Sequence, residues 1–389
     1  MARPTSRRSL RFENLEDRQL LSSAAPSNDQ QLALQLINMA RTTPKLAAQW
    51  LSKNIGSDVS NTLKHFNVDV NSVLNTISSS NPLPPVAWNA DLADAAQAHS
   101  DDMAANQYQS HTGSDGSSAD DRIANSGYNA TSTGENAFAY ADSVDNAMQA
   151  FLYDWGVSDA GHRRNLLQPG VSADNSFTDV GVGVAKSSSG KVGPVLITQD
   201  FGRSASATPQ LLGVVYSDDD SDGFYSAGEG QGSVEIDATN LATGATSSTK
   251  TWDSGGYQMP LSAGKYQVTA SENNVVIKQV NVTISNQNVE QDFVTSNSWD
   301  GRSLSAATMR TAASTPSASA STVAVTPTPV AVTPTPTPVA VAPTVMSAQV
   351  SSSTASSSKM AVFTPSNWKG PDVAASAMAA WTTWKARSN

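Results

Sequence analysis

A run of closely spaced prolines, TPTPVAVTPTPTPVAVAP at residues 326–343, limits most strongly what this 389-residue chain can fold into. Proline fixes its own backbone angle and has no N–H group, so such a run neither continues a helix nor pairs within a sheet. The stretch around it, residues 303–362, is dominated by Ala, Ser, Thr, Pro and Val. We therefore expect residues 303–362 to be a disordered linker of extended polyproline type, with the folded domains in front of it.

The region before the linker divides into two parts by its hydrophobic pattern. In residues 27–205, apolar side chains recur at helical spacing from Ser143 to Trp155, and strand-like runs follow at 179–185 and 193–201. This mixture predicts an α+β domain. Past Pro209 the pattern changes to short alternating runs broken by Gly and Asn, such as KYQVTA. That pattern predicts a small all-β domain at residues 209–295.

Charge and composition exclude several classes of protein. The net charge of −10 argues against a nucleic-acid binder, and the absence of cysteine excludes disulfides, thiolate metal sites and a cysteine nucleophile. No run of 18 apolar residues is present, so we expect no transmembrane span.

The first 26 residues form an Arg-rich segment without the apolar core of an ordinary signal peptide. Its residues match a bacterial N-terminal export motif: Arg7-Arg8, Phe12-Glu13, Leu15-Glu16, Arg18 and Leu20-Leu21-Ser22. We therefore expect residues 1–26 to be an export segment and the protein to be extracellular or on the cell surface. The alternative is a disordered basic tail.

Four histidines are the main candidates for chemistry in the α+β domain. His99 lies on the apolar stripe of its expected helix and is expected to be a core residue, and nothing points to a function for His65. His111 lies in residues 108–134, a stretch rich in Ser, Gly and Asp that we expect to be a loop. His162 follows the helix that ends at Trp155, and Glu135 lies between them in the sequence. Two His and one Glu are a typical three-ligand set for Zn²⁺. No HExxH pair is present, so spacing alone leaves open whether the three share a site.

Seven motifs follow one another through this domain in a distinctive order: SHTGSDGSS (110–118), SGYN (126–129), GENA (134–137), Trp155 with Ser158, GHRRNLL (161–167), VGVGVA (180–185) and TQDFG (198–202). Over residues 28–203 the sequence resembles the CAP superfamily of cysteine-rich secretory, venom antigen-like and plant pathogenesis-related proteins, in a bacterial cysteine-free form. The stretch 44–80 is longer than this resemblance leads one to expect.

The resemblance implies an α-β-α sandwich with a surface cleft lined by two His and two acidic residues. His111, Glu135 and His162 fall on three of these positions. The second acid falls on Ser158, so this sequence departs from the full set, and Asp159 is the neighbouring acid that could replace it. Gly161 is expected to let the chain turn before His162.

A second motif, DDDSDGFYSAGE at residues 218–229, fits the pattern of a calcium-binding loop. The expected ligands are Asp218, Asp220, Asp222, the Phe224 carbonyl and Glu229. The flanks are strand-like, so the arrangement resembles the SdrD B-like repeat of bacterial surface adhesins, related to Cna-B and carboxypeptidase-regulatory-like β-sandwiches. We expect a bound, structural Ca²⁺; the alternative is an acidic turn.

The last segment, residues 363–389, is expected to form a tryptophan-bearing amphipathic tail. Val373, Ala377, Trp381 and Trp384 lie near one face of a helix over 371–388. Such a tail suits contact with a cell wall or membrane surface, or with a partner, and equally suits a helix that packs on nothing permanently.

These features predict an exported bacterial CAP-domain protein that binds a lipid, glycan or protein in its cleft. One alternative is a metal-dependent hydrolase or peptidase that uses His111, Glu135 and His162, with Ser158 or Asp159 as further candidates. The other is a non-catalytic surface scaffold. The identity of the ligand and the oligomeric state do not follow from the sequence.

Overall fold

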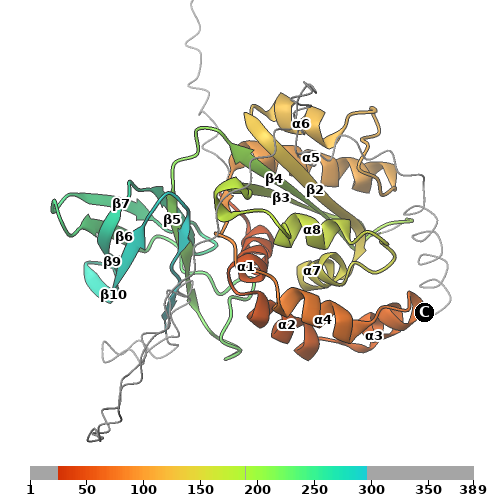
Figure 1. Cartoon of the computed structure of the whole chain (residues 1–389), viewed down its shortest axis with the longest axis horizontal. Helices are drawn as coiled ribbons and strands as arrows, with labels where there is room; N and C mark the ends of the chain where they lie inside the picture. The colour runs from red at the N-terminus through yellow and green to blue at the C-terminus, as the bar shows by residue number, and fades with distance from the viewer. Residues whose placement is uncertain (1–24, 189, 296–389) are drawn as a thin grey trace, which may run out of the picture. The chain divides into compact units, whose positions relative to one another are not determined.

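The computed structural model describes residues 25–188 and 190–295 (Figure 1). Nearly all of the expected export segment, the whole linker and the whole tail therefore lie outside the described residues. Among the described residues, no helix is long and apolar enough to cross a membrane.

Residues 25–204 form a mixed helical and strand region, as the hydrophobic pattern predicts. Its helices are α1 (Asn28–Thr42), α2 (Pro44–Lys53), α3 (Ser57–His65), α4 (Val70–Ser78), α5 (Ala90–Asn106), α6 (Ala119–Ser126), α7 (Val144–Tyr153) and α8 (Gly161–Leu167), with a 3₁₀ turn at Ala173–Asn175. Its strands are β1 (Ala87–Trp88), β2 (Ala130–Ala141), β3 (Asp179–Lys186) and β4 (Val195–Ser204).

The four strands make one sheet in the order β1-β3-β4-β2, with β1 parallel to β3 and the other pairs antiparallel. Helices cover both faces: α5 and α6 lie on one side, and α1, α7 and α8 on the other (Figure 1). The result is the three-layer α-β-α arrangement.

Two glycines of β3 explain how closely α5 approaches the sheet. A Cβ atom on Gly181 would come within 2.0 Å of the Ala93 backbone nitrogen, and one on Gly183 within 2.2 Å of the Ala96 carbonyl oxygen. Only a residue without a side chain fits at either position. The GVG of the VGVGVA motif is therefore a packing requirement between strand and helix.

Arg41, on α1, links several segments of the chain through hydrogen bonds. The side chain is fully buried and donates hydrogen bonds to the carbonyl oxygens of Pro84, Leu166 and Phe177, each at 3.1 Å. Burial lowers the pKa of Arg41 to about 9. Because Leu166 is in α8, this buried arginine helps to fix the helix that carries His162.

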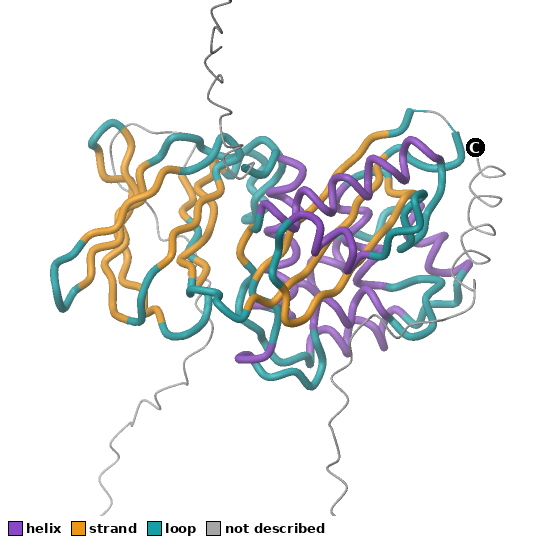
Figure 2. Tube along the Cα trace, turned by 90° about the horizontal axis from the view of Figure 1, so that it is seen from above, coloured by secondary structure: helices purple, strands orange, loops and turns teal. Residues whose placement is uncertain are grey.

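Residues 210–295 contain strands and loops without a helix (Figure 2). The strands are β5 (Gln210–Ser217), β6 (Glu235–Asn240), β7 (Thr246–Lys250), β8 (Gly256–Pro260), β9 (Gly264–Glu272), β10 (Val275–Ile284), β11 (Val289–Glu290) and β12 (Phe293–Thr295). One sheet has the order β10-β9-β6-β7, and in the other β5 pairs with β8, β11 and β12. Alternate residues of β9 are buried, as expected for a strand with one face in a core.

The structure differs from the sequence-based expectation in two places near the histidines. The stretch 108–134, expected to be a loop, contains α6 and the start of β2. Gly161 does not make the turn before His162, because Ala160 has the left-handed backbone (φ 54°) and precedes α8 as its N-terminal cap residue. The turn therefore depends on a residue with a side chain, which costs about 1 kcal/mol.

Candidate functional site

Three segments converge at the candidate cleft. His111 comes from the loop between α5 and α6, Glu135 from β2, and His162 from the first turn of α8. The imidazole rings of His111 and His162 have centroids 6.4 Å apart and are tilted by 34°. The structure thus brings together the three residues that the sequence analysis selected.

Glu135 is the buried centre of this arrangement, with a side chain only 3 % exposed. Its Oε1 lies 2.7 Å from Nδ1 of His111, and its Oε2 accepts a hydrogen bond of 2.5 Å from Arg122. Burial by itself raises the pKa of Glu135. The hydrogen bond and charge of His111, together with Arg122, outweigh burial and lower this pKa to about 2. Glu135 is therefore a fixed carboxylate with both oxygens engaged by cations or donors.

Burial and Glu135 shift the pKa of His111 in opposite directions. Desolvation of the ring lowers the pKa of His111, but the hydrogen bond and the negative charge of Glu135 raise it by more, so the net shift is upward. An Nδ1 without a proton would direct a lone pair at the carboxylate oxygen. Nδ1 therefore carries the hydrogen, and in the neutral ring Nε2 carries the lone pair.

His162 has the same kind of carboxylate partner, which the sequence analysis did not identify. Its Nδ1 lies 2.7 Å from Oδ1 of Asp154, whose side chain is 1 % exposed. The other oxygen of Asp154 accepts a hydrogen bond from the Arg163 backbone, and Asp154 itself has a left-handed backbone (φ 58°) at the end of α7. Neither Ser158 nor Asp159 takes this role: both are exposed in the turn after Trp155, and Nδ1 of His162 faces Asp154 instead.

Arg163 and Asn165 hold the backbone around the cleft. Arg163 donates to the carbonyl oxygens of Leu152 and Tyr153. Asn165 donates to the Glu135 carbonyl and to the side chain of Asn136. His99 is 1 % exposed, and its Nε2 lies 2.7 Å from the Ser110 carbonyl, so it supports the loop of His111 from inside the core.

Asp200 is a further buried acid at this site, directly across the sheet from Glu135 in the register of β2 and β4. It is fully buried, and neither carboxylate oxygen meets a hydrogen-bond donor among the described residues. Burial, and then the negative charge of Glu135, raise the pKa of Asp200 well above its usual value. The sequence signal for it is weak, because only the strand register brings TQDFG opposite GENA.

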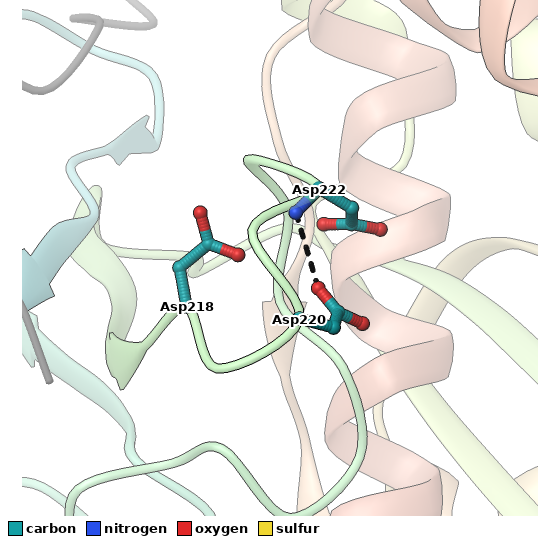
Figure 3. Close-up of side chains that lie close together, drawn as sticks. All are labelled: Asp218, Asp220 and Asp222. Atoms are coloured by element: carbon teal, nitrogen blue, oxygen red, sulfur yellow. Dashed lines mark hydrogen bonds between the residues drawn. The ribbon is translucent and has the colours of Figure 1, made fainter.

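The acidic loop lies between β5 and β6 (Figure 3). One carboxylate oxygen from each of Asp218, Asp220 and Asp222 lies within 4.8 Å of the others. The carboxylates accept hydrogen bonds from backbone groups of the same loop, at 3.2 Å from Gly223 to Asp218 and 3.1 Å from Asp222 to Asp220.

The other two expected ligand residues, Glu229 and Phe224, have buried side chains. Glu229 is 7 % exposed and accepts from the backbone of Asp219 and Ser226, at 2.8 and 2.7 Å. Phe224 is buried, and Gly223 has a φ of 79°, which only glycine adopts freely.

The comparisons with known proteins concern the mixed helical and strand region, residues 25–204. The model of the CAP family, described as the cysteine-rich secretory protein family, matches residues 34–201. A solved structure of an extracellular protein containing a SCP domain from Bacillus anthracis strain Ames is 28 % identical, over 38 % of this chain and 44 % of that one, with a TM-score of 0.26. The alignment thus spans less than half of that protein.

A second solved structure, venom allergen-like protein 4 of Schistosoma mansoni, is 18 % identical over 38 % of this chain and 86 % of that one, with a TM-score of 0.23. A comparison with curated proteins gives no match. On the strength of the family model, residues 34–201 are a CAP domain of the cysteine-rich secretory protein family.

Proposed function

We propose that this protein is an exported CAP-domain protein whose cleft binds a ligand through the paired imidazoles of His111 and His162. One observation carries the proposal: Nδ1 of each histidine lies 2.7 Å from a buried carboxylate, Glu135 or Asp154. Two separate carboxylates thereby fix the orientation and the tautomer of both rings. Such partners are typical of histidines that bind metals or ligands through Nε2.

The same geometry supports Zn²⁺ as a bound ion in the cleft. His111 and His162 would hold it through Nε2, with their rings 6.4 Å apart at the centroids. Zinc–nitrogen distances are about 2.0–2.1 Å, so both rings would have to direct Nε2 at one point between them. A bound Zn²⁺ would supply a Lewis-acid anchor for an oxygen or nitrogen atom of the ligand.

Binding is favoured over hydrolysis because Glu135, the acid that the hydrolase alternative uses, is a poor general base. A general base works best with a pKa near the working pH, whereas the pKa of Glu135 is about 2 and both of its oxygens are engaged. The second acid of the family set is Ser158 here. We therefore assign Glu135 to orienting His111 instead of to ligating the metal.

Zinc titration of the full chain by calorimetry tests this proposal. We expect one site per chain at neutral pH, lost in His111→Ala and in His162→Ala. His65→Ala, which removes an exposed histidine on α3, is the matched control and should bind zinc as the wild type does. Equal binding by all four proteins would contradict the metal site. Zinc-dependent turnover of a peptide or ester, lost in Glu135→Gln, would favour the hydrolase instead.

We also propose that residues 218–229 bind a structural Ca²⁺. The observation that supports it is the approach of three carboxylate oxygens to within 4.8 Å of one another, in a loop with no basic residue. Like charges at this separation repel, and a divalent cation with oxygen ligands offsets the repulsion. Chelation with EGTA should lower the melting temperature of the full chain, and an unchanged value would contradict the proposal.

The export part of the proposal depends on the match of residues 1–26 to an export motif. Fractionation of the native bacterium tests it directly. The protein should be found outside the cytoplasm, and replacement of Arg7 and Arg8 by Ala should retain it inside.

A further inference from the structure

A groove outside the cleft lies between α3 and α4 and has a volume of about 460 Å³. Its apolar lining comes from Ile55, Leu63, Val68 and Val70. Leu63 is 3 % exposed and forms the floor, whereas the other three are half-buried. These side chains leave apolar surface in contact with water, which a docked partner would cover.

The groove is preformed by the turn that joins the two helices. The Val68 N–H donates to the Leu63 carbonyl at 2.9 Å, and the Asn67 N–H donates to the Lys64 carbonyl at 3.2 Å, with Asn67 in the left-handed conformation (φ 51°). Asp69 then caps α4 by accepting from the Ser72 backbone at 3.0 Å. Because these bonds fix the turn, a partner need not organise the groove on binding.

The chain's own C-terminal segment has the sequence of a suitable occupant. Val373, Ala377, Trp381 and Trp384 follow one another at spacings of four, four and three residues. This is the pattern by which an amphipathic helix lays one face into an apolar groove. Each tryptophan can bury roughly 150–250 Å², and a helix of this length is marginal in water unless it packs against something.

The length of chain outside the described residues allows the segment to reach the groove. Residues 296–380, 85 in number, separate Thr295 from Trp381. A fully flexible chain of that length has an end-to-end distance of roughly 50 Å, and an extended proline-rich run within it lengthens this reach. A folded unit of this size has a radius of gyration of roughly 19 Å. Tethering also gives the segment an effective concentration near the millimolar range, which a free partner would have to exceed.

We propose that residues 371–388 dock as an amphipathic helix into the α3–α4 groove of the same chain. The indole rings of Trp381 and Trp384 cover the apolar lining. The groove lies within the 44–80 stretch, which is longer than the family resemblance leads one to expect. This inference is independent of the metal proposals.

A spin label on the full chain tests the proposal, because the protein has no cysteine and one engineered site is labelled cleanly. The label is attached to Lys64→Cys, an exposed position on the groove rim. The signals are the indole N–H resonances of Trp381 and Trp384, assigned with Trp→Phe variants. We expect both to lose at least half of their intensity, and to recover it in Val68→Glu, which puts a charge into the groove.

The matched control carries the label at Asn125→Cys, exposed on α6, and should leave both indole signals unchanged. Equal effects from the two labels, or none from Lys64→Cys, would overturn the proposal. Docking onto a second copy of the chain is tested with a mixture in which some chains carry only the spin label and the others only the isotope label. Loss of intensity in that mixture, where label and indole are on different chains, would assign the groove to a second copy and overturn docking in the same chain. Far-UV circular dichroism checks that Val68→Glu still folds.

Discussion

The histidine cleft and the acidic loop neutralise their charges in opposite ways. In the cleft, Glu135 is neutralised by His111 and Arg122, which come from other elements of the fold. In the loop, Asp218, Asp220 and Asp222 accept hydrogen bonds mainly from their own backbone, and residues 218–229 contain five acids and no base. The cleft therefore carries its own counter-charges, whereas residues 218–229 carry none, which is why we propose that they bind a cation from solution.

Among changes to the cleft, removal of the Arg122 side chain should lower the free energy of unfolding the most. Arg122→Ala leaves Glu135 buried beside Asp200 with only His111 as partner, and loss of one member of a buried ion pair costs about 3–5 kcal/mol. Urea unfolding of the full chain measures the change. Arg164→Ala, an exposed arginine on α8, is the control and should stay within about 0.5 kcal/mol. A similar small change for Arg122→Ala would mean that the cleft does not depend on its counter-charge.

Acid should weaken the cleft through Glu135. Its pKa is about 2 in the folded chain against an ordinary value of 4.5, so the stabilisation is present above pH 4.5 and is lost as the pH falls towards 2. The shift corresponds to on the order of 3 kcal/mol. Unfolding free energies measured from pH 6 to pH 2 should fall less steeply in Glu135→Gln than in the wild type. The same dependence of unfolding free energy on pH in both proteins would contradict a lowered pKa for Glu135.

Chelation should affect the loop and leave the cleft unchanged. A Ca²⁺ concentration of 100 times the dissociation constant stabilises a folded protein by about 2.7 kcal/mol, and EGTA removes this. Calorimetry should record a lower melting temperature for the wild type and no EGTA response for Asp220→Asn. Asp253→Asn, an exposed acid outside the loop, should respond as the wild type does. A response in Asp220→Asn equal to that of the wild type would contradict a Ca²⁺ site in the loop.

The smallest expected effect comes from Asp200. Its folded pKa is raised by burial and by Glu135, so the unfolded chain releases this proton more readily, and the fold loses stability as the pH rises above the ordinary aspartate value. Asp200→Asn should therefore raise the melting temperature at pH 7, by roughly 2–4 °C for each kcal/mol, and change little at pH 3. Destabilisation at pH 7 would contradict a raised pKa.

The difference between the two regions also determines what can be read from the sequence. The acidic loop lies within twelve consecutive residues, so its candidate ligands follow from spacing alone. His111, Glu135 and His162 were selected by family motifs, but Asp154 and Arg122 were not, because their roles depend on a left-handed helix end and on a helix within a stretch expected to be loop.

One missed element did leave a local signal. Ser118 and Asp121 form a capping box at the start of α6, a pattern visible as S-x-x-D. Asp200 left no comparable signal, since only the pairing of β2 with β4 brings it opposite Glu135. Long-range pairings of this kind require the fold itself.

Nitrogen NMR of the imidazole rings in the metal-free full chain tests the central claim most directly. Measured above the raised pKa of His111, both His111 and His162 should carry hydrogen on Nδ1, and added Zn²⁺ should shift both Nε2 signals together. His65 serves as the internal reference and should not respond. Hydrogen on Nε2 of either cleft ring, or a response to zinc from only one of them, would contradict a pair of imidazoles held by carboxylates for binding.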